Sequence, residues 1–342
     1  MSKYVTLDAV LRTLAALMIA LVGLFVLNNY LVYWRGWPEF SATVARLGLT
    51  DAALPSPATA PALGWIQLLG YGAILTFTAL LVRLTPARSL RDDAGLYARL
   101  AGYVIRAAYW SVLLIGLVDM LISFLRVEGF LQAVTGKYLA TQLGRPAFRG
   151  TYVHYPLLVA SLVIARFSRS LGFTWLTLLV VMAEFQVVVS RFVFSYEQAF
   201  MGDLVRFWYA ALFLFAAAHT LAEEGHVRVD VLYANFSRRG KALANAAGSV
   251  LLGLPVCWTI MLQGMAGKGA SINSPLLGFE ISQSGYGMYV KYLMAGFLLV
   301  FAISMALQFV STFLDNTATL RDEPAPQSEP KPQPQQAAPS MP

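Results

Sequence analysis

Polar and ionisable residues inside apolar stretches are the first candidates for chemistry in this chain. Asp119 lies in one such stretch, and Glu184 and Gln186 lie in another. Arg191 follows Glu184 by seven residues, so the two side chains would share one face of a helix. Within a membrane, such groups form either a proton or ion relay or a set of pairs between helices. The sparseness of the acids favours pairing.

The histidines and the cysteine do not have the spacing of a cofactor site. A membrane cytochrome b needs histidines at one depth on facing helices, whereas His154 begins one apolar stretch and His219 ends another. His226 lies in a charged connection, and the single cysteine, Cys257, lies in an apolar stretch. The sequence contains no HExxH or CxxC pattern. It therefore predicts no catalytic residue, no metal, no cofactor and no disulfide in this chain.

The composition predicts a membrane protein. Hydrophobic residues make up 58% of the chain and charged residues 13%, and the mean hydropathy is +0.61. Apolar runs of about 20 residues recur, which is the length of a membrane-spanning helix. We therefore expect an all-α polytopic membrane protein. The net charge of +7 is expected to reside at helix ends, where basic residues meet anionic lipids, and nucleic-acid binding is excluded.

Eight apolar stretches are candidate spans, and the fourth is short. They cover residues 10–33, 63–84, 100–125, 152–167, 171–194, 204–222, 243–265 and 289–313. If the fourth stretch is interfacial instead of spanning, the count becomes seven; its uniformly apolar centre favours eight. Residues 126–151 are expected to form a loop. Residues 322–342 are rich in Pro, Gln, Ala and Ser and predict a disordered tail.

The distribution of Lys and Arg predicts the orientation of the second half of the chain. Arg228, Arg238, Arg239 and Lys241 lie between the sixth and seventh stretches, so this connection and the C-terminus should be cytoplasmic. In the first half, basic residues divide equally between the two sides. Eight spans would place the N-terminus in the cytoplasm, and seven would place it outside.

The densest cluster of charges follows the sixth stretch. It comprises Glu223, Glu224, His226, Arg228 and Asp230, of which the last three alternate with valines. Such a connection at the membrane surface is either an ordinary interfacial cap or a docking surface.

This connection carries a family resemblance. The segment from His219 to Leu232, with its His-Val-Arg-Val-Asp motif, resembles the charged turn of the small-permease subunit of TRAP transporters, the DctQ-like family. Arg191-Phe192 stands where that family usually has Arg-Tyr at the end of its first helix. Asp203-Leu204 stands where a Glu-Leu pair commonly opens the second, and Arg238-Arg239 follows the turn.

The resemblance implies a domain organisation. Residues 171–315 would form the four-helix small-permease core, preceded by about three additional helices in residues 1–150 and a short helix or interfacial segment in 151–170. Residues 316–342 would form a cytoplasmic tail. The usual small permease has only the four-helix core, so this chain is an enlarged variant.

The resemblance also implies a function. The chain would be a scaffold subunit in a bacterial or archaeal inner membrane and not an enzyme. It would support a large elevator-type permease (DctM-like) in sodium-coupled uptake of an organic acid. A periplasmic binding protein (DctP-like) would deliver that acid, and sodium would bind in the large permease.

The candidate site residues then have structural roles. Arg191, Asp203 and Arg206 would form a polar group near the outer face, and Glu223, Glu224, His226, Arg228 and Asp230 would fix the inner turn. Two alternatives remain: a stand-alone transporter or channel that uses Glu184 and Asp119, and a membrane-bound redox or enzyme subunit.

Overall fold

The fold is a bundle of helices. The computed structural model describes residues 2–48, 61–170, 172–196, 198, 200–222, 233–282 and 287–324, and these residues contain helices but no strand. Seven helices in this part of the chain are long and apolar enough to cross a membrane. The predicted all-α membrane fold is therefore confirmed.

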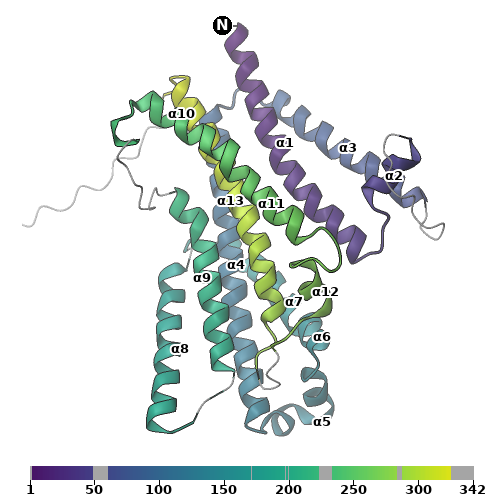
Figure 1. Cartoon of the computed structure of the whole chain (residues 1–342), viewed down its shortest axis with the longest axis vertical. Helices are drawn as coiled ribbons and strands as arrows, with labels where there is room; N and C mark the ends of the chain where they lie inside the picture. The colour runs from purple at the N-terminus through teal and green to yellow at the C-terminus, as the bar shows by residue number, and fades with distance from the viewer. Residues whose placement is uncertain are drawn as a thin grey trace, which may run out of the picture.

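The elements follow one another in the order shown in Figure 1. They are α1 (Ser2–Tyr33), α2 (Phe40–Arg46), α3 (Pro61–Leu84), α4 (Leu90–Val127), α5 (Leu131–Leu143), α6 (Pro146–Arg149), η1 (Gly150–His154), α7 (Tyr155–Phe167), α8 (Phe173–Val193), α9 (Met201–Ala222), η2 (Tyr233–Asn235), α10 (Arg238–Gly248), η3 (Ser249–Gly253), α11 (Leu254–Gly264), α12 (Asn273–Gly278) and α13 (Lys291–Leu320). The candidate spans are α1 from Leu7, α3, α4, α8, α9, the continuous α10–η3–α11, and α13.

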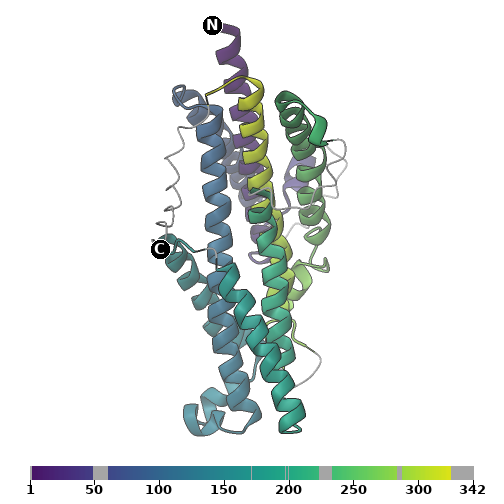
Figure 2. The same ribbon diagram turned by 90° about the vertical axis from the view of Figure 1, so that its left-hand side faces the viewer.

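The two most buried of the candidate spans, α4 and α13, form the centre of the bundle. They pack along each other, and both also contact α9. Figure 2 shows α4 (blue) running most of the height of the molecule, with α13 (yellow) beside its upper part. A capping box starts α4: the backbone N–H of Asp92 donates to the Ser89 hydroxyl, and the N–H of Ser89 donates to the Asp92 carboxylate. The apolar core includes side chains from α1, α4, α8, α9, α11 and α13.

The short fourth stretch of the sequence belongs to a longer helical segment. α6, η1 and α7 follow one another without a break from Pro146 to Phe167. α7 packs along α4, and Ser161 and Ala165 form its buried side. The segment from 126 to 151, expected to be a loop, instead contains α5 and α6. α5 is interrupted at Gly136, which has a φ of 78°.

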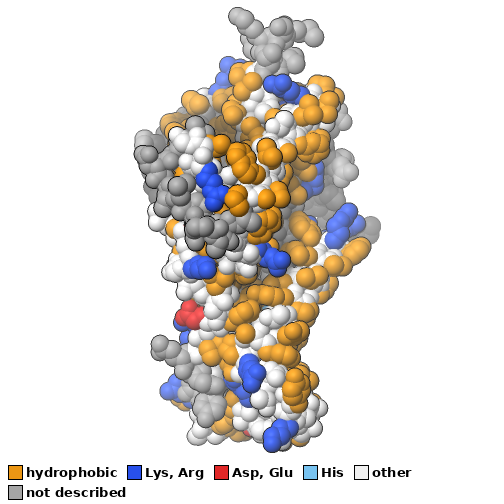
Figure 3. All heavy atoms as spheres, turned by 90° about the vertical axis from the view of Figure 1, so that its right-hand side faces the viewer, with side chains coloured by type: hydrophobic (Ala, Val, Ile, Leu, Met, Phe, Trp, Pro, Cys, Tyr) orange, Lys and Arg blue, Asp and Glu red, His pale blue; other side chains and the backbone are white. Residues whose placement is uncertain are grey.

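The first helices form a pair at the side of the bundle. α3 packs mainly against α1 and α2, and the amide of Gln67 donates to the side-chain oxygen of Asn28 over 2.6 Å. At the far end of α1, Asn29 donates to the carbonyl of Met265. Figure 3 shows the face of the molecule with this pair, where hydrophobic side chains predominate and cations are scattered.

Both ends of the described chain lie at the same end of the bundle. Asp8 of α1 forms an ion pair of 3.1 Å with Arg321, which directly follows α13. The N-terminal turns of α1 and the last turn of α13 also lie close together in Figure 1.

Candidate functional site

The most completely buried polar cluster surrounds Asp119 in the last third of α4. Asp119, Arg149 and His154 are fully buried, and they come from α4, α6 and η1. The neighbouring Tyr289 and Tyr292 come from the start of α13 and the residues before it. Asp119 was a candidate from the sequence, whereas Arg149 and the two tyrosines were not.

Arg149 neutralises Asp119 within the protein interior. Its Nη1 atom lies 2.9 Å from Oδ1 of Asp119 and also donates to the Ser123 hydroxyl over 3.2 Å. Its Nε atom donates to the carbonyl of Leu143 over 3.0 Å. The guanidinium stays charged because arginine is not deprotonated in proteins.

His154 connects the same carboxylate to a tyrosine. Its Nε2 atom lies 3.1 Å from Oδ1 of Asp119, and its Nδ1 atom lies 2.8 Å from the Tyr292 hydroxyl. Because an ionised carboxylate only accepts hydrogen bonds, Nε2 carries the proton of this contact. In the neutral ring Nδ1 then accepts from the Tyr292 hydroxyl. The ring orientation is therefore fixed from both sides.

Tyr289 closes the cluster. Its backbone N–H donates to Oδ2 of Asp119 over 2.9 Å, and its hydroxyl donates to the carbonyl of Gly144 over 3.0 Å. The guanidinium groups of Arg126 and Arg149 lie 4.6 and 4.1 Å from the centre of its ring. Arg126 also donates to the Tyr289 hydroxyl. Both carboxylate oxygens of Asp119 are thus occupied, and the arrangement holds helices together without leaving the carboxylate open to an ion.

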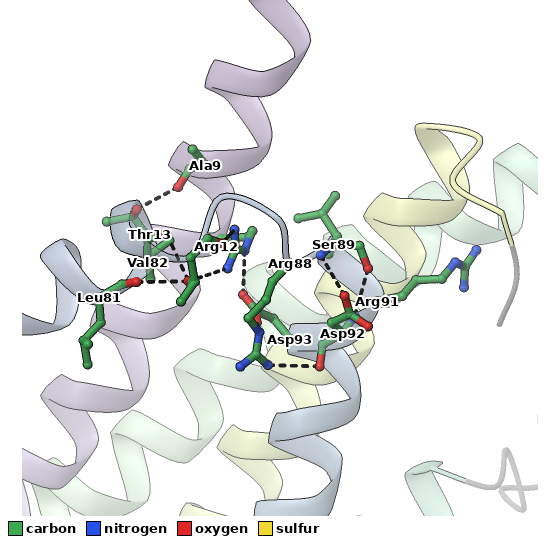
Figure 4. Close-up of polar contacts among 12 residues, drawn as sticks. Ala9, Arg12, Thr13, Leu81, Val82, Arg88, Ser89, Arg91, Asp92 and Asp93 are labelled. Carbon is green, nitrogen blue, oxygen red and sulfur yellow. Dashed lines mark hydrogen bonds and ion pairs between the residues drawn. The ribbon is translucent and has the colours of Figure 1, made fainter.

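A second buried ion pair lies at the opposite end of α4, where Figure 4 shows it. Arg12 of α1 donates from Nε to Asp93 over 2.7 Å and from Nη1 to the carbonyl of Thr85 over 2.9 Å. Asp93 also pairs with Arg88 at 2.9 Å. The sequence does not reveal this cluster, because its members flank the apolar stretches and look like ordinary interfacial charges.

Glu323, three residues after the end of α13, caps the start of α4 beside this pair. The Glu323 carboxylate accepts from the backbone N–H groups of Leu90 and Arg91, over 3.3 and 3.4 Å. A carboxylate at a helix N-terminus accepts hydrogen bonds from free N–H groups and interacts favourably with the positive end of the helix dipole. Arg91 in turn pairs with Asp315 of α13 at 2.6 Å.

Arg191, Asp203 and Arg206 were expected to form a polar group near the outer face, and the structure brings Asp203 and Arg206 together. Asp203 is buried and accepts hydrogen bonds from the Ser282 hydroxyl and from the backbone N–H of Met288, both over 3.1 Å. Arg206, which is mostly exposed, lies 3.6 Å from the same carboxylate. Arg191 is exposed on α8 and forms no hydrogen bond or ion pair with another described residue. Asp203 therefore anchors the segment before α13.

The other sequence candidates lie on the outer side of α8 or outside the described residues. Glu184 and Gln186 are exposed, and the Gln186 amide is 3.5 Å from the side chain of Gln198. Glu223, Glu224, His226, Arg228 and Asp230 lie outside the described residues. His219, near the end of α9, stacks on Phe173 with ring centres 5.4 Å apart.

Comparison with known protein families identifies the second part of the chain. The family model of the DctQ component of tripartite ATP-independent periplasmic transporters matches residues 176–319. This part of the chain belongs to the DctQ family. No curated protein and no solved structure matched the chain. The resemblance in the sequence is thus confirmed over residues 176–319, and additional helices precede this region.

The DctQ region, residues 176–319, begins within α8 and ends at the last turn of α13. The cluster around Asp119 joins it to the added helices, since Tyr289 and Tyr292 belong to the DctQ region and the other members precede it. α4 also packs tightly on this region. A Cβ atom built on Gly116 would lie 2.4 Å from the indole nitrogen of Trp208, which donates to the carbonyl of Val112 over 3.3 Å.

Proposed function

We propose that this chain is the scaffold subunit that supports a large elevator-type permease during sodium-coupled uptake of an organic acid. A periplasmic binding protein would deliver the acid, and the large permease would hold both substrate and sodium. The match of residues 176–319 to the DctQ component is the observation that carries the proposal.

The arrangement of polar groups supports a static role. The Asp119 cluster and the Arg12–Asp93 pair tie α4 to its neighbours near both of its ends. Breaking a buried ion pair is costly, so such pairs resist sliding of helices past one another. A helix bundle fixed in this way is suited to hold a moving partner.

The same geometry disfavours a stand-alone transporter that uses Asp119 and Glu184. Asp119 is fully buried, with both oxygens bonded. Glu184 is exposed on α8, which packs mainly against α9 and not against α4. The two carboxylates therefore do not share a path through the bundle.

The ion pair of Asp8 with Arg321 supports an even number of membrane passes. Seven passes would leave the two ends of the chain on opposite sides. We infer that α7, continuous with η1 and α6, supplies the eighth pass. Because Arg238, Arg239 and Lys241 favour a cytoplasmic connection before α10, both termini would lie in the cytoplasm, and the membrane would be the bacterial or archaeal inner membrane.

Reconstitution tests the function. Liposomes that hold this chain alone should take up no organic acid from a panel of labelled carboxylates under a sodium gradient. Liposomes with the large permease and the binding protein added should take up one of them, and removal of sodium should stop uptake. Sodium-driven uptake by this chain alone would overturn the proposal.

A further inference from the structure

α8 presents an ionisable side chain on its outer face at mid-length. Glu184 is the twelfth of the 21 residues of α8. It is exposed and forms no hydrogen bond or ion pair with another described residue. The side chains around it on this face are apolar and open: Val181, Phe185 and Val188 are 57%, 61% and 50% exposed.

A carboxylate in this position does not suit a face that is covered by lipid. The hydrocarbon core offers no hydrogen-bond donor, and an acidic side chain at the centre of a spanning helix is among the most unfavourable residues for insertion. Intramembrane ionisable residues almost always face protein or water. The position of Glu184 therefore indicates a protein surface over this part of α8.

Comparison with α3 strengthens this interpretation. α3 is equally open, with 11% of its central residues buried, the same share as α8. It carries no acidic or basic residue between Pro61 and Arg83, which is the composition that lipid requires. α8 differs from α3 in carrying Glu184, a carboxylate in the middle of the helix, which lipid does not tolerate.

α8 has room for a partner. Only Leu176 and Ala183 are buried along its length, and it packs mainly against α9. It lies at the edge of the bundle in Figure 1, away from α1 and α3. The side of α8 opposite α9 is therefore uncovered by the described residues.

We propose that the outer face of α8, defined by Val181, Glu184, Phe185 and Val188, docks against a transmembrane helix of the large permease. That helix presents a cation or another hydrogen-bond donor at the depth of Glu184. This inference rests on the proposed function, since it takes the large permease as the partner. It adds which face is the interface and what chemistry the partner brings.

Site-specific photo-crosslinking in the intact complex tests the interface. A benzophenone amino acid would replace Phe185 on α8 or, as the matched control, Phe77 on α3, which is 59% exposed. After irradiation of native membranes, Phe185 should give an adduct with the large permease, and Phe77 should not. An adduct between two copies of this chain, or none while the large permease still copurifies, would overturn the docking face but leave the proposed function standing.

Substitution of Glu184 tests the chemistry. If a donor faces it, Glu184→Leu should lower the recovery of the large permease about fivefold or more, because the donor loses its partner. Glu184→Gln should retain more of it, because the amide oxygen still accepts. If lipid covers the face instead, Glu184→Leu should leave recovery unchanged and raise the yield of the chain, which would overturn the proposal. Failure to recover the large permease with the unmodified chain would overturn both proposals together.

Discussion

Asp119 and Arg149 form an ion pair of 2.9 Å in which both side chains are completely buried. They lie on different helices of the N-terminal part, and the backbone of Tyr289 completes the coordination of the carboxylate from the DctQ region. The added helices are thus joined to the small-permease region through a charged cluster in the interior. The extension and the DctQ region should therefore unfold together.

The buried Asp119–Arg149 ion pair should contribute strongly to the free energy of unfolding. Asp119→Asn removes the charge that compensates Arg149 and should destabilise the folded protein by about 3–5 kcal/mol. The matched control is Asp315→Asn, since Asp315 also pairs with an arginine but is 53% exposed, and it should cost about 0–1 kcal/mol. Thermal unfolding of the detergent-solubilised chain measures both.

A double variant distinguishes charge pairing from a general effect of substitution. Adding Arg149→Met to Asp119→Asn removes the unpaired cation and should recover part of the lost stability. Arg149→Met alone gives the loss of stability expected for that substitution without coupling. If adding Arg149→Met to Asp119→Asn lowers the stability by that same full amount, the two residues are not coupled and the proposed charge pairing is wrong.

The packing of α4 on α9 predicts opposite effects of alanine at two glycines. Gly116→Ala should lower the unfolding temperature, because the new methyl group meets the Trp208 indole and overpacking costs about 1–3 kcal/mol. Gly72→Ala in α3, where the added atom meets nothing, should raise it slightly, because alanine favours helix more than glycine does. Equal shifts for the two variants would contradict the close contact.

The pair at the other end of α4 should hold α1 in place. Arg12→Gln removes a charge-assisted hydrogen bond to Asp93 and should cost about 1.5–3 kcal/mol. Arg88 still neutralises Asp93, so the loss should be smaller than that for Asp119→Asn. Arg35→Gln, at an exposed position, serves as the control. An unfolding temperature equal to that of the control would show that α1 is held by its apolar contacts alone.

The ion pair between Asp8 and Arg321 leads to a topology prediction. A fluorescent protein that matures only in the cytoplasm should fluoresce when fused to either end of the chain. Alkaline phosphatase, which is active only in the periplasm, should be inactive at both ends. Phosphatase activity at the N-terminus together with fluorescence at the C-terminus would establish seven passes and contradict the eighth pass through α7.

Hydropathy predicted the helices well because lipid thickness sets both the length and the apolarity of a span. It could not predict α5 and α6, which are short and polar enough to resemble a loop. Nor could it pair Arg149 with Asp119 or His154 with Tyr292, since these contacts join segments distant in sequence and leave no local periodicity. The motif in residues 223–232 predicted the family although these residues lie outside the described structure.

For Glu184, the sequence identified the residue but not its surroundings. The sequence identified Glu184 as an intramembrane carboxylate but not the direction in which its side chain points. Helical periodicity tells which residues share a face, but not whether that face lies against the bundle or outside it. The structure places Glu184 on the outer side of α8, away from α4.

The decisive measurement is purification of the chain from its native membrane in mild detergent, followed by mass spectrometry of the proteins that accompany it. A scaffold subunit should bring one larger polytopic permease with it in stoichiometric amount, retained through size-exclusion chromatography. Recovery of this chain alone, stable and monodisperse, would contradict its role as the scaffold of a two-subunit membrane complex.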